Sequence, residues 1–86
     1  MEEAIKEAVW NILEKRCGVD FRQRPEDREE PLLGPRLQVP ARELLYVYAD
    51  LERLLGKPVG EEDVKEGRFD TAEHILACVE RALAQN

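Results

Sequence analysis

Apolar residues recur at helical spacing in four segments of this chain, and in none of them do apolar and polar residues alternate as in a β-strand. In the first segment the apolar positions fall on one stripe when successive residues are turned by about 100°. Gly18 predicts the end of this helix, because glycine readily adopts the left-handed conformation of a C-cap. Trp10 lies just beside the stripe, so we expect it to cover the edge of the fold. The stripe consists of Ile5, Ala8, Val9, Ile12 and Leu13.

A long connection, GVDFRQRPEDREEPLLGPRLQV, follows the first helix and contains prolines and a glycine that prevent helix formation. Its charges alternate in sign, which is typical of a solvated surface. A loop of this length is uncommon in a small domain unless its own side chains hold it against the core. The side chains that we expect to anchor it are Phe21, Leu32, Leu33, Leu37 and Val39.

The second helix is predicted to begin near Pro40, whose missing N–H suits the first turn of a helix, and to end at Gly56. After it, the segment KPVGEEDVKEG predicts one short turn of helix between Gly60 and Gly67. The core stripe of the second helix consists of Leu44, Val47, Tyr48, Leu51, Leu54 and Leu55.

The last helix is predicted to begin with Asp70 or Thr71 as its N-cap and to carry Glu73 in its first turn. The order of elements predicts an all-α fold, a small antiparallel four-helix bundle with a long loop between the first two helices and a short third helix. Because 86 residues supply only one core, we expect a single domain over residues 1–86. The inward face of the last helix consists of Ile75, Cys78, Val79, Ala82 and Leu83.

The charge of the chain restricts its partners. A formal net charge of −6 repels nucleic acid and anionic lipid, so we expect neither as a partner and expect basic patches on partner proteins instead. The longest apolar run, the six residues from Leu44 to Ala49, is far too short to span a membrane. The acidic N-terminal segment MEEAIKEAVW differs from the basic-then-apolar layout of a secretion signal, so we expect a cytoplasmic protein. Acid-rich bundles of this size are commonly monomeric, so we also expect a monomer.

The sequence contains no recognisable catalytic or metal-binding motif. Cys17 and Cys78 do not have metal-ligand spacing, and the single His74 is not spaced to join them. We therefore expect free thiols, no metal, no cofactor and no enzymatic activity. The carboxylates after the second helix lack the alternation and the glycine of a calcium loop, and we interpret them as a solvated helix face. They are Glu61, Glu62, Asp63 and Glu66.

Three segments, in sequence order, resemble parts of the acyl carrier protein family. The stretch LLYVYADLERLLG is similar to the family's recognition helix with its L-E-x-x-[FL]-G ending, which Leu51, Glu52, Leu55 and Gly56 match. KPVGEEDV stands where the family has a short x-x-I-P-x-x-D segment, and RFDTAEHILACVERAL is similar to its final helix. The resemblance covers residues 37–84 and implies a carrier-protein fold.

The chain departs from the family where carriers attach their phosphopantetheine arm. The family's D-S-L triplet aligns with Pro40, Ala41 and Arg42, and the chain contains no serine. Alanine has no hydroxyl oxygen to form the phosphodiester, and the hydroxyl of Thr71 lies on the wrong helix. The resemblance therefore implies a carrier homologue without a prosthetic group. The chain is similar to carrier-related proteins lacking this serine that accompany enzymes of bacterial peptide-maturation (bacteriocin-type) gene systems.

Without an arm, the exposed side of the second helix becomes the informative surface. If Leu45 and Tyr46 face solvent, they form a docking patch together with arginines, since Arg and Tyr are enriched at protein interfaces. If the long loop lies on them, they are structural. The candidate partner-binding residues are Arg42, Leu45, Tyr46, Ala49 and Arg53.

These observations predict an accessory docking or recruitment module. Its expected partner is a protein: a biosynthetic or modifying enzyme, or a precursor peptide. Two alternatives stay open. One is an acyl or peptidyl carrier that is loaded at an unconventional site, and the other is a small bundle that holds an acyl ligand non-covalently between its helices.

Overall fold

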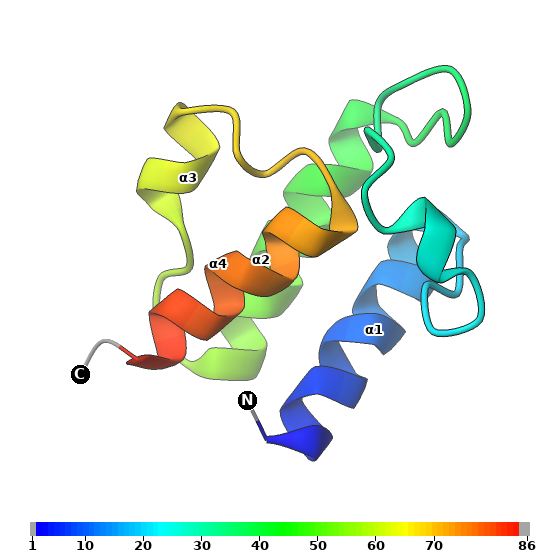
Figure 1. The fold of residues 1–86 in the computed structure, drawn as a ribbon. Coiled ribbons are helices and arrows are strands. Elements are labelled where there is room, and N and C mark those ends of the chain that lie inside the picture. Colours follow the sequence, from blue (N-terminus) through cyan, green and yellow to red (C-terminus); the bar gives the residue numbers. More distant parts are fainter. Residues whose placement is uncertain (1, 85–86) are drawn as a thin grey trace.

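Four α-helices joined by loops make up the computed structural model of the protein, which describes residues 2–84 apart from the side chain of Glu61 (Figure 1). The helices are α1 (Glu3–Cys17), α2 (Ala41–Leu55), α3 (Glu61–Lys65) and α4 (Ala72–Ala84), and a 3₁₀ turn, η1 (Pro25–Asp27), lies in the long connection. The described residues contain no β-strand. The all-α prediction and the order of its helices are therefore confirmed.

The helix ends are set by residues that the sequence pattern identifies. Gly18 and Gly56 adopt the left-handed conformation, with φ of 76° and 69°, and each donates its N–H to a carbonyl in the last turn of its helix. At the start of α4, Oγ1 of Thr71 accepts a hydrogen bond of 3.0 Å from the N–H of His74. Thr71, and not Asp70, is therefore the N-cap.

One hydrophobic core joins the longer helices, because α1 packs against both α2 and α4. The Cα radius of gyration is 11.8 Å. This value is close to the roughly 12 Å expected for a globular chain of this length. The side chains buried completely at the centre include Val9, Leu13, Val47, Leu51, Ile75 and Val79.

Trp10 is buried in this core, which contradicts the prediction that it covers the edge of the fold. The long connection folds back over it, so that the ring centroids of Trp10 and Phe21 are 6.3 Å apart. The guanidinium carbon of Arg28 lies 4.9 Å from the centroid of the Trp10 ring, and Nε of Arg28 donates a hydrogen bond of 2.9 Å to the carbonyl oxygen of Phe21. The period of one helix cannot reveal this burial, because the covering residues come from another segment.

The connection is anchored by most of the predicted side chains. Leu32 is held through its backbone, because its N–H donates a bond of 2.8 Å to the carbonyl of Asp70 and its carbonyl accepts one of 2.8 Å from Val39. Leu33, the next residue, is exposed, so its predicted role as an anchor is wrong. The side chains that do pack into or against the core are Phe21, Leu32, Leu37 and Val39.

Most of the alternating charges of the connection lie at the surface, as predicted, but Asp27 is buried and several of the charges form ion pairs. Asp27 is fully buried, and each of its carboxylate oxygens lies 2.8 Å from a guanidinium nitrogen, one of Arg24 and one of Arg36. These contacts are ion pairs without the angles of hydrogen bonds. A carboxylate tolerates burial only when it is paired in this way. A second set of ion pairs joins Arg22 to Glu7, Glu14 and Asp20.

Replacing Asp27 by alanine is expected to lower the free energy of unfolding by about 2 kcal/mol, because it removes the pairs that join two parts of the connection. Urea unfolding followed by Trp10 fluorescence measures this change. The matched control is Glu26→Ala at the exposed neighbouring position, for which we expect a change within about 0.5 kcal/mol. Equal stability of the two variants would contradict the anchoring role of Asp27.

Candidate functional site

The start of α2 presents a methyl group at Ala41, the residue that the resemblance to carriers aligns with their arm-bearing serine. Ala41 is the first residue of α2 and is exposed, and Pro40 precedes it with φ of −63°. Arg42 follows, with its Nε 3.8 Å from the carboxylate of Glu43. The start of α2 is therefore accessible but presents no hydroxyl to a cofactor-transferring enzyme.

The five candidate partner-binding residues on α2 are all exposed. Leu45, at 72%, is the most exposed of the large apolar side chains that the structure describes. The alternative that the long loop covers Leu45 and Tyr46 is wrong, because the loop lies over Trp10 of α1. Tyr46 instead contacts Arg16, whose guanidinium carbon lies 5.0 Å from the ring centroid. We refer to Arg42, Leu45, Tyr46, Ala49 and Arg53 as the α2 face.

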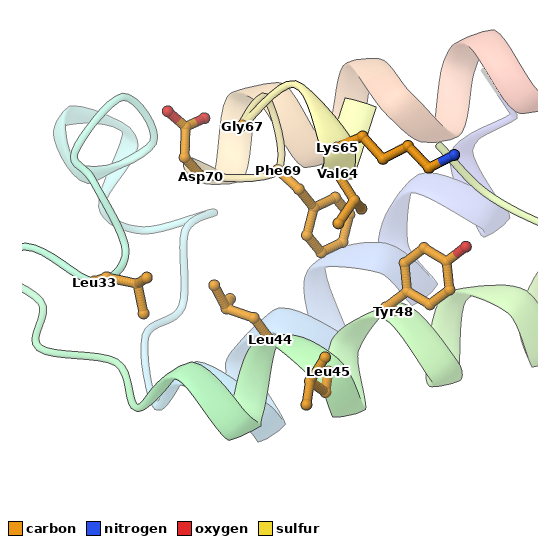
Figure 2. A pocket seen from close by; sticks show the side chains of 9 residues that line it. All are labelled: Leu33, Leu44, Leu45, Tyr48, Val64, Lys65, Gly67, Phe69 and Asp70. Carbon is orange, nitrogen blue, oxygen red and sulfur yellow. The ribbon is translucent and has the colours of Figure 1, made fainter. Parts of the chain in front are cut away.

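An apolar groove borders the α2 face and lies between α2, α3 and the segment that leads into α4 (Figure 2). Its volume is about 530 Å³. Sites that bind small molecules usually measure about 300–1,000 Å³. Inside the groove, the rings of Tyr48 and Phe69 meet edge to face with their centroids 6.0 Å apart. The apolar lining consists of Leu33, Leu44, Leu45, Tyr48, Val64 and Phe69.

The rim of the groove carries exposed apolar side chains. Leu33 and Val64 are 58% and 45% exposed, and Leu45 completes the rim on α2. Asp70 also lines the groove, but Figure 2 shows its carboxylate turned away from the apolar side chains. Its Oδ1 lies 2.6 Å from Nδ1 of the exposed His74. The lining of the groove is mostly apolar, so the groove is suited to apolar contact.

Sequence reasoning missed the groove, because its lining comes from separate segments that only the folded chain brings together. The available signal is a set of large apolar residues outside the inward stripes of the helices, but Leu33 is predicted to anchor the long connection and Val64 lies in an acidic segment. The placement of Leu54 in the core stripe of α2 is also wrong, because its side chain is exposed.

α3 forms one wall of the groove and is tied to α4 by a buried carboxylate. Asp63 is buried, which contradicts its assignment to a solvated face. Its Oδ1 lies 2.7 Å from Nη2 of Arg81 and 2.7 Å from Nε of Arg68. These guanidinium groups, Arg81 foremost, hold the pKa of Asp63 well below its usual range. Gly60 and Gly67, with φ of 58° and 74°, flank the short helix.

Neither cysteine is suited to nucleophilic chemistry at neutral pH. Burial raises the pKa of the Cys17 thiol and of the Cys78 thiol to about 11, so both stay protonated. Cys78 is a packing residue, because a β-carbon added at Gly60 would lie 3.2 Å from its Cβ. The two cysteines are not joined in a disulfide.

Among the side chains that the structure describes, no group of three or more His, Cys, Asp or Glu is placed to hold a metal ion. Over residues 2–84, none of the helices has the length and hydropathy needed to cross a lipid bilayer. Comparisons with models of protein families, with curated proteins and with solved structures gave no match.

The ion pairs of Asp63 predict a specific response to acid. Because its pKa is lower in the folded state than the value of about 3.9 for an unfolded chain, its stabilising effect is complete above about pH 4 and is lost as the pH falls. Asp63→Asn is therefore expected to lower the Tm at pH 6. Between pH 6 and pH 3 the variant is expected to lose less in Tm than the parent protein, because asparagine has no charge to lose. Thermal unfolding by circular dichroism at both pH values measures this difference.

Glu62→Gln serves as the control for the acid experiment, since Glu62 is an exposed carboxylate of the same helix. Its Tm is expected to follow that of the parent protein at both pH values. A loss in Tm that is as steep in Asp63→Asn as in the parent protein would contradict the role assigned to Asp63.

Proposed function

We propose that this protein is a non-enzymatic homologue of carrier proteins that docks a partner protein and carries nothing covalently. In this proposal it recruits or positions a biosynthetic or modifying enzyme, or a precursor peptide, within a biosynthetic or peptide-maturation (bacteriocin-type) system. The observation that carries the proposal is the exposed apolar rim of the groove, formed by Leu33, Leu45 and Val64. A continuous apolar surface at a polar boundary is typical of an interaction site.

The order of the elements supports the carrier-type part of the proposal. A long helix, a long connection, a second helix, a short helix and a last helix follow one another as the resemblance implies. The second helix also begins at Ala41, the residue that the resemblance aligns with the arm-bearing serine. On this proposal, the helix start retains the carrier geometry and has lost the carrier chemistry.

A carrier that is loaded at an unconventional site has less support. The hydroxyl of Thr71 accepts the capping hydrogen bond from the N–H of His74 and lies in a buried residue. The thiols of Cys17 and Cys78 are protonated at neutral pH because their pKa values are raised to about 11. These hydroxyl and thiol groups are therefore poor acceptors for an arm.

The groove suits an aliphatic or aromatic side chain of a protein partner. Removing apolar surface from water contributes about 25 cal/mol per Å², and interfaces concentrate their binding energy in a few anchors that fill such pockets. Leu45 belongs both to the rim of the groove and to the α2 face. One partner can therefore contact both surfaces at once.

The substitution Leu45→Asp tests the docking function. Because Leu45 is exposed, we expect the free energy of unfolding to change by no more than about 0.5 kcal/mol. The affinity for the partner is expected to fall at least about tenfold, since a charge replaces an apolar contact. The partner is obtained by affinity capture from the native cell, and its binding is then measured by calorimetry. Glu62→Gln, a change outside the groove lining, is the control, and equal affinities for all three proteins would contradict the proposal.

A second candidate function is non-covalent binding of an acyl chain, which the groove volume of about 530 Å³ favours. It predicts that the fluorescent probe N-phenyl-1-naphthylamine binds the protein and that a long-chain fatty acid displaces it. Val64→Asp places a charge on the groove rim and is expected to weaken probe binding at least about tenfold. Probe binding that is indifferent to both the fatty acid and this substitution would contradict the second candidate.

A further inference from the structure

The solvent-facing side of α2 carries no acidic residue, although the chain as a whole has 19 acidic and 13 basic residues. The exposed positions of the helix are those of the α2 face together with Ala41 and Leu54. The three carboxylates of the helix belong to Glu43, Asp50 and Glu52, and all three residues are partly buried. The α2 face therefore departs from the acidic character of the whole chain.

Arginines hold two of these partly buried carboxylates. Asp50 pairs with Arg53 and with Arg16, whose Nε lies 2.7 Å from Oδ2 of Asp50. The hydrogen bond from Arg16 is the main cause of the lowered pKa of Asp50. Glu43 lies near Arg42, at 3.8 Å. The side chains of Arg42 and Arg53 nevertheless remain 74% and 73% exposed, so both guanidinium groups have donors left for a partner.

The two arginines lie at the ends of an apolar centre. They are eleven positions apart, which at 1.5 Å per residue separates them by about 16 Å along the helix axis and leaves them on the same side. Leu45, Tyr46 and Ala49 lie between them on this side. The guanidinium group of Arg16 lies over one side of the Tyr46 ring and makes a favourable cation–π contact with it.

We infer that the partner of the α2 face is an amphipathic helix of another protein whose apolar stripe lies between two carboxylates about 16 Å apart. This inference rests on the proposed docking function and names the chemistry of the partner. Each carboxylate pairs with Arg42 or Arg53 through charge-assisted hydrogen bonds, for which the guanidinium fork is well suited. The apolar stripe covers Leu45 and reaches the rim of the groove.

The local charge of the face, and not the net charge of the chain, selects this partner. At physiological ionic strength the Debye length is about 8 Å, so carboxylates of other elements are largely screened at the contact, whereas Glu43 and Asp50 beside the two arginines are partly buried. Arg42 and Arg53 lie at the contact itself. We therefore expect a partner with carboxylates at the contact in place of the basic partner that the net charge of −6 predicts.

A second copy of the chain is a poor occupant of the same face. A two-fold symmetric contact through α2 would place Arg42 and Arg53 of one copy against the same residues of the other. Like charges that meet in this way weaken an interface. A partner with carboxylates avoids this repulsion.

A displayed library of helical peptides, selected on the full chain, tests the inference. Each peptide carries a leucine stripe at i, i+4 and i+7 and randomised residues at two flanking positions eleven residues apart. Selection is expected to enrich Asp and Glu at both flanking positions. A selected acidic peptide is then expected to bind Arg42→Glu and Arg53→Glu at least about tenfold more weakly than the parent protein, because each substitution replaces an attractive charge by a repulsive one.

Lys15→Glu is the matched control, because it changes the net charge equally at an exposed position of α1 outside the α2 face. We expect it to change the affinity less than about twofold, since Lys15 is exposed and is not one of the two arginines that pair with the partner's carboxylates. Enrichment of Lys or Arg, the absence of any charge preference, or equal effects of Arg42→Glu and Lys15→Glu would overturn the inference and leave the docking function standing. If no selected peptide depends on Leu45, as judged with Leu45→Asp, the docking function is overturned as well.

Discussion

The cover that the long connection places over Trp10 determines what α2 presents to solvent. Because Phe21 and Arg28 contact the indole ring, the connection lies against α1. A chain of 86 residues has little core of its own, so side chains of the connection become part of it. Because the connection packs there, it leaves Leu45 and Tyr46 exposed. The exposed side of α2 is thus a consequence of how the first third of the chain is buried.

Local sequence predicted the helices and their ends, because stripes, glycine stops and the Thr71 cap each depend on residues within a few turns. Burial of single side chains depends on distant partners and was predicted less well. Asp63 illustrates this, since its burial depends on Arg81 of α4. The same distinction between local pattern and distant contacts applies to the candidate site. The helical period predicts which residues share the α2 face, whereas their exposure depends on the connection lying over Trp10, and the groove requires tertiary folding to bring Leu33 and Val64 to α2.

Charge has a structural role in this protein that its net value does not reveal. Ion pairs join the connection to itself through Asp27, α1 to α2 through Arg16 and Asp50, and α3 to α4 through Asp63 and Arg81. In each case a largely shielded carboxylate accepts contacts from arginines that retain some exposure. These three carboxylates are thereby paired within the fold, and the arginines that pair with them keep part of their side chains at the surface. A protein with an acidic composition can therefore present a surface of the opposite character.

The two sides of the groove differ in how firmly they are held. α2 is fixed by Val47 and Leu51, which are completely buried, whereas α3 is a short helix with a left-handed glycine before and after it and the buried Asp63 tying it to α4. Ion pairs with solvent-accessible arginines are weaker restraints than a packed apolar core, and regions held in this way open locally before the rest of a protein unfolds. The α2 side of the groove is consequently held more firmly than the α3 side. Partner side chains of different size can therefore enter the groove without disturbing the core. This favours binding of several related segments over strict selection of one.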